Sequence, residues 1–178
     1  MIRRGLLAPL SSVIAVVADV FAAFHFGGLR INASASLPIG LYRTTSDVTA
    51  RLVEFCPSEP YASLSADRAY RGTGVCPDGA EPLMKPTVAT EGDAVEVSQA
   101  GVEVNGRLLP NSAPLRRDAK GRPLQHWPFG RYRVLPGTAW VISSFNRRSF
   151  DSRYFGPIST ASVRHHLQPL FTEETPLH

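Results

Sequence analysis

The chain of 178 residues is long enough for one domain with a small appendage, and its 43% hydrophobic and 19% charged residues exclude a disordered chain. The formal net charge of +4 is mild, and no basic stripe interleaved with aromatics occurs, which argues against nucleic-acid binding. Fifteen prolines and fourteen glycines predict many turns and short strands rather than long helices.

The first element expected is a membrane-spanning helix over residues 5–29, an apolar segment that follows two adjacent arginines. It is long enough to cross about 30 Å of hydrocarbon. Basic residues before it predict a cytoplasmic N-terminus and an exported remainder. We therefore expect an anchor over 1–29 and a periplasmic domain over 30–178. A cleaved signal peptide is the alternative, and Asp19 weighs against both because a buried carboxylate is costly in a bilayer.

Beyond this segment, short runs of β-type residues alternate with clusters of turn residues. These runs predict strands over 40–43, 50–57 and 82–93, a meander over 94–110, a strand pair over 130–145 and a last strand over 159–171. One short helix is expected around 64–70, and a polar surface loop over 111–128. The predicted fold class is mostly β, with antiparallel strands, a variable excursion over about 96–138 and one N-terminal transmembrane helix.

Cys56 and Cys76 are the two cysteines of the chain. In an exported protein such a pair most simply forms a disulfide, with two unpaired thiols as the alternative. Closing a loop of this size would stabilise the fold by roughly 3 kcal/mol if it acts by restricting the unfolded chain. The five histidines are scattered, so we expect no metal site and no cofactor.

Lys85 lies within the apolar run PLMKPTV. If a strand carries this run through the core, the ammonium group is desolvated and loses its proton more easily. A neutral lysine can then serve as a general base. The ordinary alternative is a lysine that extends to solvent from a strand edge.

The segment 145–158, FNRRSFDSRYFGPI, combines several hydrogen-bonding side chains with flanking aromatic residues. Aromatic residues at that density predict a buried polar network rather than an arginine-rich exposed turn, which is the alternative. The polar residues concerned are Asn146, Arg147, Ser149, Asp151, Ser152 and Arg153.

Three strings in this order, SASLP, LMKPTVATEGD and SFDSRYFG, resemble the S26 signal peptidase family, whose members use a Ser–Lys dyad. The resemblance covers nearly the whole chain and implies a signal-peptidase-like antiparallel β fold of the LexA/signal peptidase type. The strings S-x-P-x-G-L-Y, GAEPLMK and DSRYFGPI, and the cysteine pair, are similar to the TraF-type peptidases of conjugative plasmid transfer. Pro86 departs from leader peptidases, which usually carry a basic residue after the lysine.

The resemblance also implies a role for each matching residue. Ser36 is the nucleophile and neutral Lys85 is the general base. The backbone N–H of Ser36 and the hydroxyl of Ser34 hold the oxyanion, and Ser149 orients the lysine. Two further residues hold the strand of Ser149 in place: Asp151 and Arg153.

The function expected from this resemblance is that of a serine endopeptidase in the bacterial inner membrane that processes the pilin subunit of a conjugative type IV secretion system. Its partner is a membrane-embedded prepilin, with other conjugation components as further partners, and no nucleic acid. Water or an amine can release the acyl-enzyme, and the pilin's own N-terminus as the amine gives a ring. The alternatives are a general leader peptidase, or a non-enzymatic membrane-anchored β protein in which Ser36 and Lys85 lie far apart.

Overall fold

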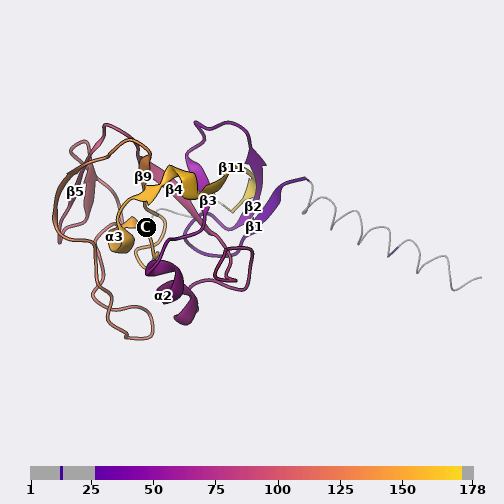
Figure 1. Cartoon of the computed structure of the whole chain (residues 1–178), viewed down its shortest axis with the longest axis horizontal. Coiled ribbons are helices and arrows are strands. Elements are labelled where there is room, and N and C mark those ends of the chain that lie inside the picture. The colour runs from indigo at the N-terminus through magenta and orange to yellow at the C-terminus, as the bar shows by residue number, and fades with distance from the viewer. Residues whose placement is uncertain (1–12, 14–26, 174–178) are drawn as a thin grey trace, which may run out of the picture.

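The computed structural model describes Val13 and residues 27–173. Within this part of the chain, the strands form a seven-stranded and a four-stranded sheet, and every described strand pair is antiparallel (Figure 1). The seven strands, in spatial order, are β1 (Leu29–Asn32), β2 (Gly40–Thr45), β11 (Val163–Thr172), β3 (Leu52–Phe55), β4 (Leu83–Ala89), β9 (Thr138–Val141) and β10 (Ile158–Ser159). The four are β7 (Arg107–Leu108), β6 (Val102–Val104), β5 (Ala94–Val97) and β8 (Gly130–Arg133). The predicted antiparallel β fold is thus confirmed.

The helices of the described residues are short: α2 (Tyr61–Asp67) and α3 (Ser152–Phe155), both labelled in Figure 1, and the 3₁₀ turn η1 (Thr160–Ser162). None of the described helices has the length and apolar character that crossing a membrane requires. The expected anchor over residues 5–29 falls outside the described residues, apart from Val13 and residues 27–29. Leu29 already belongs to β1, and the anchor itself stays a prediction.

Two hydrophobic clusters flank β9, whose alternate side chains point to opposite faces. Ala139 and Val141 join the first cluster and Trp140 joins the second. The other buried members of the first cluster are Val53, Phe55, Leu83, Phe150, Tyr154, Phe155 and Ile158. Those of the second are Ala89, Val95, Val97, Val102, Val134 and Ile142. β9 pairs with β4 on one side and with the short edge strand β10 on the other, and it is buried on both faces.

One strand pairing expected from the sequence is wrong. Residues 130–145 do contain two strands, but these do not pair with each other. β8 is largely exposed and pairs with β5 at the edge of the small sheet, whereas β9 pairs with β4 and β10. The helix expected around 64–70 begins earlier, at Tyr61, directly after Pro60, which occupies the N-cap position.

The predicted disulfide is present between Cys56 and Cys76. It joins the end of β3 to the irregular excursion that contains α2. The same excursion is held by Arg71, which is buried and pairs with Asp78. The guanidinium of Arg71 also donates to the carbonyl oxygens of Ala62 and Glu81. The excursion is therefore an ordered wall beside β4 and not a loose loop.

Candidate active site

Ser36 lies in the short loop between β1 and β2, and one buried asparagine organises that loop. Asn32 Nδ2 lies 2.8, 3.0 and 3.1 Å from the carbonyl oxygens of Ser34, Leu37 and Pro38. Its Oδ1 accepts from the backbone N–H of Ser34 at 3.2 Å and from the Ser34 hydroxyl at 2.9 Å. Asn32 thereby fixes the backbone on both sides of Ser36. Asn32 is not among the residues expected at the site from the sequence, although an asparagine two residues before a serine is a common turn-forming signal.

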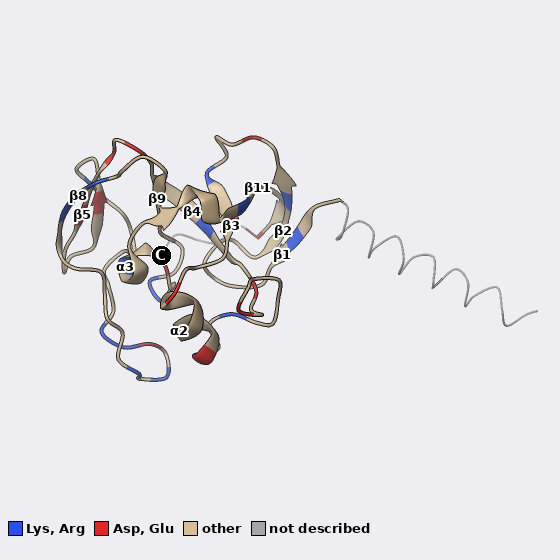
Figure 2. Ribbon diagram, viewed as in Figure 1, with Lys and Arg blue, Asp and Glu red and all other residues tan. Residues whose placement is uncertain are grey.

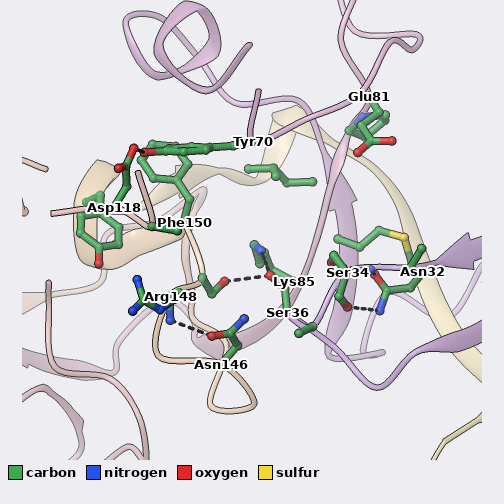
Figure 3. Close-up of a pocket in the computed structure, with 18 of the residues that line it drawn as sticks. Asn32, Ser34, Ser36, Tyr70, Glu81, Lys85, Asp118, Asn146, Arg148 and Phe150 are labelled. Atoms are coloured by element: carbon green, nitrogen blue, oxygen red, sulfur yellow. Dashed lines mark hydrogen bonds between the residues drawn. The ribbon is translucent and has the colours of Figure 1, made fainter. Parts of the chain in front are cut away.

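The structure brings Ser36, Lys85 and Ser149 together from three distant segments (Figure 3). Lys85 Nζ lies 2.6 Å from Ser36 Oγ, and the hydroxyl oxygens of Ser36 and Ser149 are 3.1 Å apart. All three side chains belong to buried residues. The expected partner of Ser149 was the lysine, whereas its hydrogen bond in the structure joins it to Ser36. The short distance between Ser36 and Lys85 contradicts the non-enzymatic alternative, which placed them far apart.

Lys85 sits in β4 opposite Val53 of β3, and 3% of its surface is exposed. Burial lowers the pKa of Lys85 from 10.5 to about 8, because the ammonium group has lost most of its hydration. The Asp151 carboxylate raises this pKa and the Arg153 guanidinium lowers it. Lys85 is therefore neutral in a sizeable fraction of molecules at mildly alkaline pH. A neutral amine 2.6 Å from a hydroxyl can accept its proton.

Asp151 and Arg153 form a buried ion pair behind Ser149. Arg153 Nε donates to Asp151 Oδ1 at 2.8 Å and Nη2 donates to Oδ2 at 2.7 Å, with both side chains fully buried. Burial alone lowers the pKa of Arg153, but the adjacent carboxylate outweighs this and raises it. The guanidinium also donates to the carbonyl oxygens of Asn111, Asn146, Arg147 and Ser149. The ion pair thus holds the backbone that presents Ser149.

Ser34 lines the same pocket as Ser36. Its hydroxyl donates to Asn32 Oδ1, so in this structure it stabilises the loop between β1 and β2. Figure 3 shows Glu81 on the same side of the Ser36–Lys85 pair as Ser34, and Asn146 and Arg148 on the opposite side. These positions make the pocket continuous across the pair.

The pocket has a volume of about 470 Å³. One wall was not expected, since residues 111–128 were interpreted as a surface loop. Four residues of this segment line the pocket: Leu115, Asp118, Ala119 and Leu124. Nothing in the polar composition of the segment indicates this placement, because it depends on contacts with residues far away in the sequence.

Comparisons with known proteins show the family to which the chain belongs. Residues 2–170 match the family described as signal peptidase, peptidase S26. The chain is 38% identical over 165 residues to an Escherichia coli plasmid transfer protein TraF, covering 90% of this chain and 93% of the relative. It is 37% identical to a probable conjugal transfer protein TraF of Sinorhizobium fredii, covering 90% and 87%. It is 34% identical to a conjugal transfer protein TraF of Agrobacterium tumefaciens, covering 96% and 97%.

Among solved structures, a signal peptidase I from Enterococcus faecalis matches with a TM-score of 0.38 and 18% identity, covering 70% of this chain and 100% of that one. The family match spans nearly the whole chain, and the relatives are similar along most of their length. The chain therefore belongs to the signal peptidase S26 family, a family of serine peptidases.

Proposed function

We propose that the protein is a Ser–Lys endopeptidase that processes the pilin subunit of a conjugative transfer apparatus. The observation that carries the proposal is the contact of 2.6 Å between Ser36 Oγ and a buried Lys85 whose pKa is lowered to about 8. The substrate class is inferred from relatives that are named as plasmid and conjugal transfer proteins. A general leader peptidase is the second candidate, supported by the same site and family.

In the proposed reaction, neutral Lys85 removes the hydroxyl proton as Ser36 attacks the scissile carbonyl, and later returns it to the leaving amine. Ser149 hydrogen-bonds Ser36 and so fixes the direction of its oxygen. The backbone N–H of Ser36 and the hydroxyl of Ser34 hold the oxyanion. For this, the Ser34 hydroxyl turns away from Asn32, to which it donates in the free enzyme. Water or an amine then releases the acyl group.

Two strand edges support the binding of an extended polypeptide. Among the described strands, β1 pairs only with β2, while residues 83–85 pair only with β3. Both unpaired edges reach the pocket, through Ile31 and Asn32 of β1 and through residues 83–85 of β4. A substrate segment in extended conformation can add to such edges by main-chain hydrogen bonds. Its scissile bond would then lie beside Ser36.

We place the catalytic domain at the periplasmic face of the inner membrane, with a membrane-embedded prepilin as substrate. An exposed apolar row supports this location. Ile31 and Phe171 lie opposite Leu41 on either side and are 65% and 76% exposed. Ile31 also lines the pocket, so the apolar row adjoins the candidate active site. A substrate held in the same membrane would meet the site at high effective concentration.

The test uses the full-length protein in membranes with prepilin, and follows the mass of the pilin. We expect Ser36→Ala and Lys85→Ala to abolish processing. The matched controls are Ser46→Ala and Lys120→Ala, which replace exposed residues of the same types. Continued processing by either active-site variant would refute the dyad. Processing of ordinary exported preproteins, but not of prepilin, would favour the leader peptidase.

A further inference from the structure

Residues 111–128, here called the strap, are fixed at both ends by Arg153. Near its start, the Asn111 carbonyl accepts from Arg153 Nη1 at 2.7 Å. Near its end, the Trp127 N–H donates to the Arg153 carbonyl at 2.8 Å. Between these points, the Leu115 N–H donates to the Tyr154 hydroxyl at 3.1 Å. The residue that holds the loop of Ser149 therefore also holds the strap.

The middle of the strap is fixed to the region of α2 through Asp118, whose side chain is 6% exposed. Its carboxylate accepts from the Tyr70 hydroxyl and from Arg122 Nε, each at 2.7 Å. Arg68 donates to the Pro123 carbonyl at 2.8 Å. Burial raises the pKa of Asp118, but the hydrogen bonds from Tyr70 and Arg122 outweigh it and the pKa is lowered. Asp118 is thus a charged positioning residue, and the strap is an ordered wall.

The two faces of the strap differ in character. Arg116, Arg117 and Lys120 are exposed, and the long loop at the lower left of Figure 2 carries basic residues on both sides of an acidic one. Leu115 and Leu124, by contrast, are half-buried and line the pocket. The three basic side chains form the solvent-exposed face of the strap. Two leucines turned to the pocket leave apolar surface that a bound ligand can cover.

This apolar surface continues onto aromatic residues of the pocket. The rings of Tyr70 and Phe150 are 5.2 Å apart, and both residues line the pocket with Leu115 and Leu124. Figure 3 shows Tyr70, Asp118 and Phe150 on one side of the Ser36–Lys85 pair and Asn32, Ser34 and Glu81 on the other. The strap therefore builds the side of the pocket that the two free strand edges do not.

We infer that the strap is a substrate-recognition element. With Tyr70 and Phe150, Leu115 and Leu124 form a subsite for an apolar side chain of the substrate. That side chain belongs to the half of the polypeptide across the scissile bond from the half that pairs with β1 and β4. The inference rests on the proposed function, since it needs a peptide acylated at Ser36. In an apolar subsite, one methylene group more or less on the substrate changes kcat/KM by about tenfold or more.

The experiment measures kcat/KM of the full-length protein for peptides spanning the cleavage site, each with one position changed to Leu, Ala or Ser. We expect the wild type to prefer Leu over Ser by about tenfold or more at one position on a single side of the scissile bond. Leu124→Ser should abolish that preference through KM, and Leu124→Phe should fill the subsite and reverse it in favour of Ala. Lys120→Ala, on the outer face of the same strap, should keep the wild-type preference.

A small fluorophosphonate that labels the nucleophilic serine reports separately on Ser36. Equal labelling of all variants, with the preference changed in both Leu124 variants, supports the subsite. If either Leu124 variant is not labelled, Leu115→Ser replaces it, with the same loss expected. Unchanged preference in labelled Leu124 variants overturns the subsite and leaves the proposed function standing. A wild type that neither labels nor cleaves overturns the proposed function itself.

Discussion

Replacing Lys85 by methionine should abolish activity and at the same time stabilise the fold at neutral pH. Burial lowers the pKa of Lys85 from 10.5 to about 8, and a tenfold change in proton affinity corresponds to about 1.4 kcal/mol. Keeping the charged lysine buried therefore costs roughly 3 kcal/mol. The variant loses the hydrogen bond to Ser36, worth about 1 kcal/mol. The expected net gain in unfolding free energy is about 2 kcal/mol at pH 7.

The gain should vanish as the pH rises, for a reason that follows from proton binding. Below about pH 8 the lysine carries its proton in both states, so the full cost of burial is present. Between about 8 and 10.5 the unfolded chain binds more protons than the folded one, and wild-type stability rises with pH. Lys85→Met lacks this dependence, so the difference should narrow by about 1.4 kcal/mol per pH unit. Buried tyrosines titrate in both proteins and cancel.

Urea unfolding of the full-length proteins in detergent measures this difference, at several values between about pH 7 and pH 10. Tryptophan fluorescence is a suitable signal, because Trp140 is buried in the second cluster and Trp127 packs against it. Lys120→Met, which changes the other lysine of the chain at an exposed position, is the control and should show no pH-dependent difference. A difference in unfolding free energy between wild type and Lys85→Met that stays constant with pH would refute the lowered pKa of Lys85. A variant less stable than wild type at neutral pH would refute the cost assigned to burial.

Four further outcomes are expected. The kcat/KM for peptide cleavage should rise with pH to a plateau, with a midpoint near the Lys85 pKa of about 8, and a flat profile would exclude the lysine base. Asn32→Ala removes the donor for three loop carbonyls, so kcat should fall more than KM rises. Urea unfolding should show an unfolding free energy lower by about 1–3 kcal/mol. An unchanged kcat would mean that the loop keeps its conformation without Asn32. Arg153→Lys keeps a positive charge beside Asp151 but leaves buried carbonyl acceptors unpaired, so it should lower the unfolding free energy by about 1–3 kcal/mol for each carbonyl that loses its donor, with faster proteolysis at residues 146–149 as the local signature. Cys56→Ser should lower the unfolding free energy by roughly 3 kcal/mol, and a reducing agent should reproduce this in the wild type but add nothing in the variant.

The strands were predictable from the sequence where local alternation decides them. Val95 and Val97 alternate with polar residues, and β5 lies where that alternation is found. The partner of β9 was not predictable in the same way. The turn at residues 136–137 favours a hairpin, but β9 pairs instead with β4 and β10 and is buried on both faces. Local patterns indicate that a strand exists, whereas its neighbours depend on the whole core.

The candidate site shows the same division between motif and geometry. The motifs identify Ser36, Lys85 and Ser149 as residues of interest, and the structure places their side chains in contact. The motifs do not specify that Ser149 contacts Ser36, because this depends on where the backbone after Asn146 is held. Nor do they indicate the strap, whose leucines are held at the pocket by contacts with distant residues, among them the hydrogen bonds of Asp118 with Tyr70 and of Asn111 with Arg153.

The Asp151–Arg153 pair has a role that stability alone does not explain. A buried ion pair carries a desolvation cost that can exceed its Coulombic gain, and apolar residues of similar volume often stabilise a fold as well. What an apolar pair cannot do is donate to the carbonyls of Asn146, Arg147 and Ser149 and to the strap at Asn111. The guanidinium therefore fixes two walls of one pocket relative to each other.

Because Arg153 holds both the loop of Ser149 and the strap, variants of Arg153 and variants of the strap leucines should differ in effect. A change at Arg153 disturbs both the loop of Ser149 and the strap, so it should alter the rate of acylation and the choice of substrate together. A change at Leu124 leaves the contacts of Arg153 intact, because Leu124 makes none of them. It should alter the choice of substrate alone. Variants of the strap leucines can therefore change substrate choice without changing the rate of acylation. Variants of the ion pair change both, because the ion pair supports both walls of the pocket.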